Sequence, residues 1–82
     1  MRVIVNVQLK NGVLDPQGKA VHHALSSLKF DGVNDVRIGK QIILDIAEQN
    51  QAKAKERVTL MCEELLANTV IEDYTIEFPA CE

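Results

Sequence analysis

The segment Val3-Ile4-Val5-Asn6-Val7-Gln8-Leu9 carries an apolar side chain at every odd-numbered position. A period of two is typical of a β-strand that buries one face and exposes the other. The next residues, Lys10-Asn11-Gly12, break the pattern and favour a turn. The sequence therefore predicts a half-buried strand at residues 3–9.

A helix is predicted directly after this strand. Asp15 can cap a helix N-terminus, and Pro16 suits the first helical position because the N–H that proline lacks would have no helical partner there. The apolar residues that follow have helical spacing: Ala20, Val21, Ala24, Leu25 and Leu28. The helix is expected to end near Asp31-Gly32, where glycine can adopt a left-handed conformation.

Residues 33–46 are predicted to form two strands. Val36 and Ile38 lie before Gly39-Lys40, and Ile42, Leu44 and Ile46 alternate after it. A glycine that opens a two-residue connection supplies the positive φ of a hairpin turn. A hairpin is therefore expected at Gly39-Lys40.

A second helix and a last strand complete the chain. Asn50 is a candidate N-cap, and Ala67-Asn68 is expected to end the helix with Asn68 in a left-handed conformation. The helix has this apolar stripe: Ala54, Val58, Met61, Cys62, Leu65 and Leu66. Residues 70–78 alternate as a strand that is closed by Pro79.

The order strand, helix, strand, strand, helix, strand predicts an α+β fold of the split βαβ, ferredoxin-like type. It would place two helices on one face of a four-stranded antiparallel sheet. We expect a single domain at residues 1–78 and a short tail at residues 79–82. The even-numbered residues of the last two strands would then share the helix-covered face with the odd-numbered residues of the first.

On the uncovered face, this register places Ile4, Ile43 and Ile71. They could form an apolar patch for self-association, which would help a domain this small. Alternatively, they are isolated surface isoleucines of no consequence. Both interpretations remain open from the sequence.

Charge and hydropathy exclude several classes of protein. The 82 residues carry a net charge of −3 with no basic cluster, which disfavours nucleic-acid binding. No apolar run approaches the roughly 20 residues that cross a bilayer, and the polar N-terminus lacks a signal-peptide core. We therefore expect a cytoplasmic protein. Cys62 is expected to be a buried, unreactive thiol, and Cys81 an exposed thiol without function.

No catalytic or metal-binding pattern emerges from the sequence. His22 and His23 are adjacent, so on a helix they point about 100° apart and cannot readily grip one metal ion. Glu72 and Asp73 would face opposite sides of a strand and cannot form a catalytic pair. The chain is expected to be a binding or scaffold module with no catalytic residues, cofactor or metal of its own.

Three stretches, in this order and spacing, resemble the PurS family, the small subunit of phosphoribosylformylglycinamidine synthase. They are Leu9-Lys10-Asn11-Gly12-Val13-Leu14-Asp15-Pro16-Gln17-Gly18, Val36-Arg37-Ile38-Gly39-Lys40 and Met61-Cys62-Glu63-Glu64-Leu65-Leu66-Ala67-Asn68. The match continues to Tyr74, and the whole resemblance runs from about Arg2 to Phe78. One departure is Thr69, where the family usually has proline.

The resemblance implies a role in the fourth step of purine synthesis, in which an amide becomes an amidine at the expense of ATP and of ammonia from glutamine. In this family a large synthetase subunit, PurL, uses ATP and magnesium, and a glutaminase subunit, PurQ, releases the ammonia. The small subunit forms a homodimer or tetramer, is required for the complex to assemble, and helps ammonia to pass between the active sites.

Exposed polar residues beside the predicted turns are the candidates for partner contacts. They are Asp15, Gln17, Arg37, Lys40 and Asn68. If Arg37 touches a partner, its replacement by alanine should weaken assembly without unfolding the domain.

Other functions share this order of elements. An amino-acid-sensing domain of the ACT type would bind its ligand near the first strand-to-helix loop. An RNA-binding RRM module would need aromatic residues on the open face of the sheet, where the chain offers only Phe30, Tyr74 and Phe78, the last two assigned to the covered face. A small enzyme is the remaining alternative.

Overall fold

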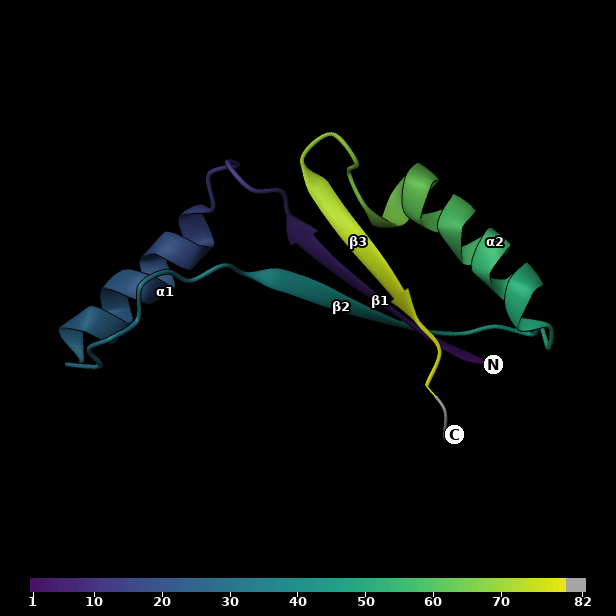
Figure 1. Ribbon diagram of the computed structural model, residues 1–82, viewed down its shortest axis with the longest axis horizontal. Helices are drawn as coiled ribbons and strands as arrows, with labels where there is room; N and C mark the ends of the chain where they lie inside the picture. The colour runs from purple at the N-terminus through teal and green to yellow at the C-terminus, as the bar shows by residue number, and fades with distance from the viewer. Residues whose placement is uncertain (80–82) are drawn as a thin grey trace.

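The computed structural model describes residues 1–79, which form a three-stranded sheet and two helices (Figure 1). The elements in order are β1 (Arg2–Leu9), α1 (Pro16–Ser27), β2 (Gly39–Asp45), α2 (Gln51–Met61), the π-helical turn η1 (Cys62–Leu66) and β3 (Glu72–Glu77).

The central strand of the sheet is β1, which pairs antiparallel with β2 on one side and with β3 on the other. In this register Val5 lies opposite Ile42 and Ile76, so the odd positions of β1 share a face with the even positions of its neighbours. Val3 and Val5 are completely buried. The prediction of a half-buried first strand, and of which residues face the core, is confirmed.

The second helix covers the core side of the sheet. Asn50 caps α2 by accepting a hydrogen bond from the Lys53 N–H at 3.2 Å, as predicted, and Val58 and Cys62 lie fully buried against β1. At Cys62 the helix widens into η1, where the Ala67 N–H donates to the Cys62 carbonyl five residues earlier, at 3.0 Å. This widened turn buries both Cys62 and Ala67. Burial also raises the pKa of the Cys62 thiol, as expected for a core cysteine.

The first helix lies apart from the sheet. Figure 1 shows α1 projecting from one end of the sheet, with the connector of residues 28–38 running back beside it. We call α1 and this connector the arm. The radius of gyration of 16.1 Å exceeds the roughly 12 Å typical of a compact chain of this length. The molecule is correspondingly elongated, measuring 48 × 30 × 14 Å.

The predicted four-stranded sheet with two helices on one face is therefore wrong in two respects. Within residues 1–79 the sheet has three strands, and only α2 covers it (Figure 1). Residues 33–38 form no strand because their backbone faces α1: the carbonyl of Val33 bonds to His22, and the N–H of Ile38 donates to Asp15.

The predicted hairpin at Gly39-Lys40 is also wrong. Gly39 is the first residue of β2 and pairs with Gln8, and its φ is not positive. A Cβ at this position would lie 2.7 Å from the Val7 carbonyl oxygen. The glycine therefore permits close approach of two strands and does not form a turn.

Several predicted boundaries shift as well. α1 ends at Ser27, earlier than the predicted end near Asp31-Gly32, and Lys29 has a positive φ of 71°. Gly32 has the positive φ that was predicted for it, 91°. Asn68 is not left-handed; its carbonyl accepts the N–H groups of Ile71 and Glu72 in the turn that leads into β3. β3 consequently begins two residues later than predicted.

Replacing Gly18 by alanine should loosen the arm. An added Cβ would lie 2.2 Å from the Val36 carbonyl oxygen, so the connector would have to move away from α1. Overpacking of this kind costs about 1–3 kcal/mol. Urea unfolding followed by circular dichroism measures the loss. The exposed neighbour provides a control: Lys19→Ala should stay within about 0.5 kcal/mol of the parent, and equal stability of the two variants would contradict the close packing at Gly18.

Candidate partner-binding site

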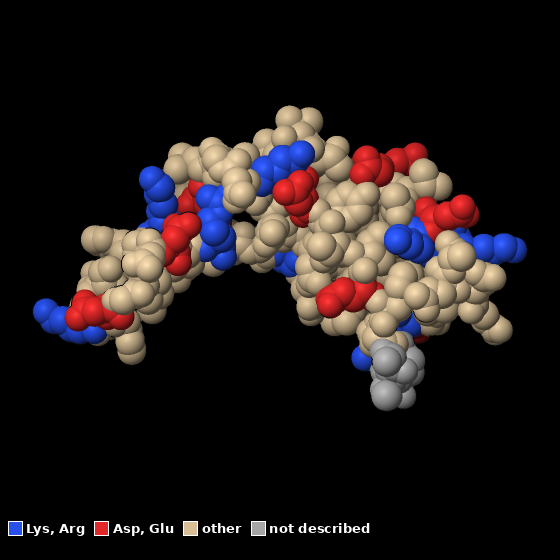
Figure 2. All heavy atoms as spheres, in the orientation of Figure 1, with Lys and Arg blue, Asp and Glu red and all other residues tan. Residues whose placement is uncertain are grey.

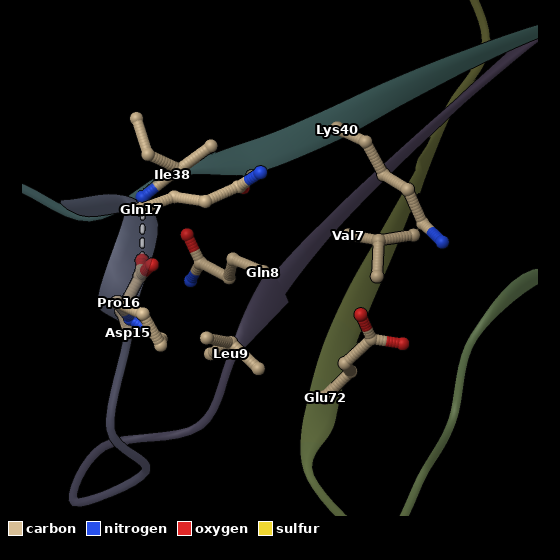
Figure 3. A pocket seen from close by; sticks show the side chains of 10 residues that line it. Val7, Gln8, Leu9, Asp15, Pro16, Gln17, Ile38, Lys40 and Glu72 are labelled. Atoms are coloured by element: carbon tan, nitrogen blue, oxygen red, sulfur yellow. Dashed lines mark hydrogen bonds between the residues drawn. The ribbon is translucent and has the colours of Figure 1, made fainter. Parts of the chain in front are cut away.

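The carboxylate of Asp15 joins the start of α1 to the end of the connector. One oxygen accepts the Gly18 N–H at 2.8 Å, and the other accepts the Ile38 N–H, also at 2.8 Å, the bond that Figure 3 shows. The residue is only 5% exposed. Sequence reasoning predicted the helix cap but not the second bond, because Ile38 lies 23 residues away.

Arg37 makes a second link at the same place. Its guanidinium donates one N–H to the Val13 carbonyl at 2.9 Å and another to the Lys10 carbonyl at 3.1 Å. These bonds hold the end of the connector against the loop that leaves β1. We call residues 10–15 and 37–38, which these two side chains tie together, the root of the arm.

The charge state of Asp15 reflects these bonds. The N–H groups of Ile38 and Gly18, helped by the nearby Arg37 cation, lower the pKa of the carboxyl group against the opposing effect of desolvation. Asp15 is therefore an anion at neutral pH, the form that accepts both N–H groups.

Next to the root lies a pocket of about 300 Å³. The end of β1, the start of β2, the start of α1 and the first residue of β3 surround it (Figure 3). Its polar lining comes from Gln8, Asp15, Gln17, Lys40 and Glu72. The side chains of Lys40 and Glu72 point toward the same side of the pocket from β2 and β3 (Figure 3).

The structure brings four of the five predicted contact residues to this end of the molecule. Asp15, Gln17 and Lys40 line the pocket, and Arg37 lies at the adjoining root. Asp15 is buried and Arg37 is bonded within the chain, whereas Gln17 and Lys40 are exposed. Gln17 and Lys40 are thus the polar side chains best placed to meet another protein directly.

The fifth candidate, Asn68, does not line the pocket. Its side-chain oxygen accepts the Val70 N–H at 3.2 Å, and its backbone N–H donates to the Glu72 carboxylate at 2.7 Å. These bonds shape the turn before β3.

The three isoleucines proposed for self-association are not contiguous. Ile4 and Ile43 lie opposite each other on the open face of the sheet, whereas Ile71 lies in the turn before β3, where its carbonyl accepts the Lys10 N–H. Between them the open face is polar: the Asn6 side chain bonds to Gln41 and to Glu77, at 3.1 and 2.6 Å. Any apolar patch on this face is therefore the pair Ile4 and Ile43.

Charged and metal-ligating groups are dispersed. Within residues 1–79 no three His, Cys, Asp or Glu side chains come close enough to hold a metal ion. The His22 ring nitrogen Nε2 lies 2.7 Å from the Val33 carbonyl oxygen, and His23 is exposed. Figure 2 shows acidic and basic side chains interspersed over the face in view.

Comparison with known proteins identifies the fold and the family together. The family model of PurS, described as phosphoribosylformylglycinamidine (FGAM) synthase, matches residues 2–80. The chain belongs to the PurS family. The resemblance seen in the sequence is thereby confirmed, and the ACT, RNA-binding and small-enzyme alternatives are set aside.

Individual relatives and solved structures support the same family assignment. The chain is 55% identical over 76 residues to the synthase subunit PurS of Bacillus subtilis, covering 93% of this chain and 89% of the relative. It is 47% identical to the Synechocystis PurS, covering 95% and 78%. A crystal structure of B. subtilis PurS superposes with a TM-score of 0.82 over 93% of this chain and 94% of that one. A chain in the structure of PurLQS from Thermotoga maritima is 37% identical and superposes with a TM-score of 0.85 over 93% of both chains.

Neither helix within the described residues is long and apolar enough to cross a bilayer.

Acid should release the link that Asp15 makes. Because its folded pKa is lowered, the stabilisation is fully present above the ordinary aspartate pKa of about 3.9 and is lost as the pH falls through the lowered value. In Asp15→Asn an amide N–H₂ would face a backbone donor, so this variant should be less stable than the parent at pH 7. The difference should shrink as the pH falls below about 3.9. Urea unfolding from pH 7 to acid measures it, and a constant difference would contradict the role of the charge.

Proposed function

We propose that this chain is the small, non-catalytic subunit of a phosphoribosylformylglycinamidine synthase in purine biosynthesis. It docks a synthetase subunit and a glutaminase subunit, PurL and PurQ, so that ammonia released from glutamine reaches the synthetase. The observation that carries the proposal is the family match over residues 2–80, together with the similarity to a chain of the Thermotoga maritima PurLQS structure.

Coupling two active sites by docking has a physical rationale. Free ammonia is protonated and diluted in water, so a glutaminase and a synthetase must be held close together for one to feed the other. A small subunit can do this by contact alone, without contributing catalytic groups. ATP and magnesium would then be used by the large subunit, and this chain would hold no cofactor and act in the cytoplasm.

Self-association is part of the proposal, and the arm supports it. Leu28 and Phe30 of the connector are 68% and 59% exposed, Val21 of α1 is 40% exposed, and the only buried residue of α1 is Gly18. Apolar side chains that the chain leaves uncovered are stabilised when another surface covers them. We propose that a second copy of the chain does so, giving the homodimer or tetramer, with the Ile4 and Ile43 pair as a second candidate surface.

A reconstitution experiment tests the coupling role. The synthetase and glutaminase subunits are assayed with and without this chain, once with glutamine and once with ammonium salt as the nitrogen source. Only the glutamine-dependent rate should need the chain, because ammonia added from solution requires no docking. If neither rate responds to the chain, the proposed function is wrong.

Leu28→Glu tests the part that the arm plays in self-association. A charge on the apolar face of the arm should shift the mass measured by light scattering toward that of the monomer, because a buried carboxylate is costly. Leu60→Glu is the matched control, since Leu60 is 61% exposed but lies on α2. An unchanged mass for Leu28→Glu would exclude the arm from the interface.

A further inference from the structure

The arm behaves as one unit because its two halves are joined along their length. The His22 ring bonds to the Val33 carbonyl at 2.7 Å near the tip. Closer to the sheet, Gly18 lies so near to Val36 that no Cβ would fit between them. α1 and the connector therefore move together or not at all.

Within residues 1–79, the root is where this unit is attached to the sheet. Two segments of chain pass from the sheet to the arm, residues 10–15 and residues 37–38. Asp15 and Arg37 are the side chains that link one segment to the other. Beyond the root, α1 projects clear of the sheet and of α2 (Figure 1), and Figure 2 shows the outline of the molecule hollowed between arm and sheet.

The guanidinium group of Arg37, which can donate two hydrogen bonds at once, suits this position. Its two donors reach two carbonyls of one turn, in which the Val13 N–H also donates to the Lys10 carbonyl and Gly12 has a φ of 85°. A planar guanidinium that engages two acceptors fixes direction as well as distance, which the point charge of a lysine does not. Arg37 therefore holds the turn and the connector in one relative orientation.

Small changes at the root are magnified along the arm. The 12 residues of α1 span about 18 Å at 1.5 Å per residue. A rotation of about 20° at the root would move the far end of α1 by about 6 Å. If the arm is free to rotate, only a fraction of the molecules has the arm at the angle that a partner needs in order to contact both the arm and the sheet. The apparent affinity for that partner is then the intrinsic affinity multiplied by this fraction.

We propose that Arg37, together with Asp15, sets the angle between the arm and the sheet and so acts in assembly as a positioning residue, without touching a partner. The proposal rests on the proposed function of the chain as a docking subunit. It replaces the sequence-based hypothesis that Arg37 is a direct contact, because both of its observed bonds go to carbonyls of this chain.

Distances between spin labels test the proposal in the protein as it assembles. Labels on Ser27→Cys at the end of α1 and Thr75→Cys on β3, both at exposed positions, report the angle of the arm. Cys62 is buried, and Cys81→Ser removes the remaining native cysteine. A small share of labelled chain is refolded with excess unlabelled chain so that only distances within one chain are seen. The variants are Arg37→Gln, which loses the guanidinium group and its paired hydrogen bonds, and Arg37→Lys, which can reach one carbonyl at a time.

We expect Arg37→Gln to broaden the distance distribution. It should also raise the concentration of this subunit that gives half-maximal glutamine-dependent rate, by about tenfold if about a tenth of the molecules keep the correct angle. The rate at saturation should recover. Arg37→Lys should fall between Arg37→Gln and the parent in both measurements. Lys40→Ala removes an exposed cation three residues away and should leave the distance distribution unchanged, whatever it does to assembly.

Two outcomes would overturn the proposal. Weakened assembly with an unchanged distance distribution would make Arg37 a direct partner contact, and a broadened distribution with normal assembly would show that the angle does not matter. If the parent chain itself fails to support the glutamine-dependent rate, the proposed function fails. The distances then still decide whether Arg37 orients the arm.

Discussion

Asp15 satisfies backbone donors from two parts of the chain that would otherwise have no reason to meet. A buried N–H must find an acceptor, and in the predicted fold the N–H of Ile38 would have found one in a neighbouring strand. It donates instead to the Asp15 carboxylate, which also caps α1. Together with the bonds that His22 and Arg37 make to backbone carbonyls, this side chain allows residues 33–38 to leave the sheet. The projecting arm, the three-stranded sheet and the uncovered apolar residues of the arm all follow.

The sequence was a good guide to the first strand, to the start of both helices and to the core cysteine, but not to the Gly39-Lys40 hairpin or to the conformation of Asn68. The alternation in β1, the caps at Asp15 and Asn50 and the burial of Cys62 were all predicted, because turn chemistry and periodicity act over a few residues. Residues 33–38 were not, since Val36 and Ile38 alternate as they would in a strand. An extended connector packed on a helix has the same spacing, and only the long-range bonds at Val33 and Ile38 distinguish the two.

In the candidate site, too, the sequence indicated some residues and could not indicate the bonds between distant parts of the chain. Gln17 and Lys40 were chosen as exposed polar residues beside predicted turns, and both line the pocket, although Lys40 lies within β2 and not beside a turn. Their contact with a partner stays a prediction. The role of Arg37 could not be predicted, because its acceptors are backbone carbonyls 24 and 27 residues away. Every residue has a backbone carbonyl, so the residue types in a sequence do not indicate which carbonyls accept a hydrogen bond from a distant side chain. For a family whose members are subunits of a larger synthase, such internal bonds matter as much as the contact residues, because they decide the shape that a partner meets.

The placing of β1 in the middle leaves β2 and β3 as edge strands. The outer backbone groups of an edge strand are a template on which another chain can add a strand. On β2 that edge carries Ile42-Ile43-Leu44, an apolar run of high β-propensity, with charge only at Lys40 and Asp45 on either side. An edge of this kind, when nothing covers it, is a site at which copies of a chain can pair and aggregate, and the charges at Lys40 and Asp45 oppose such pairing only at its two ends.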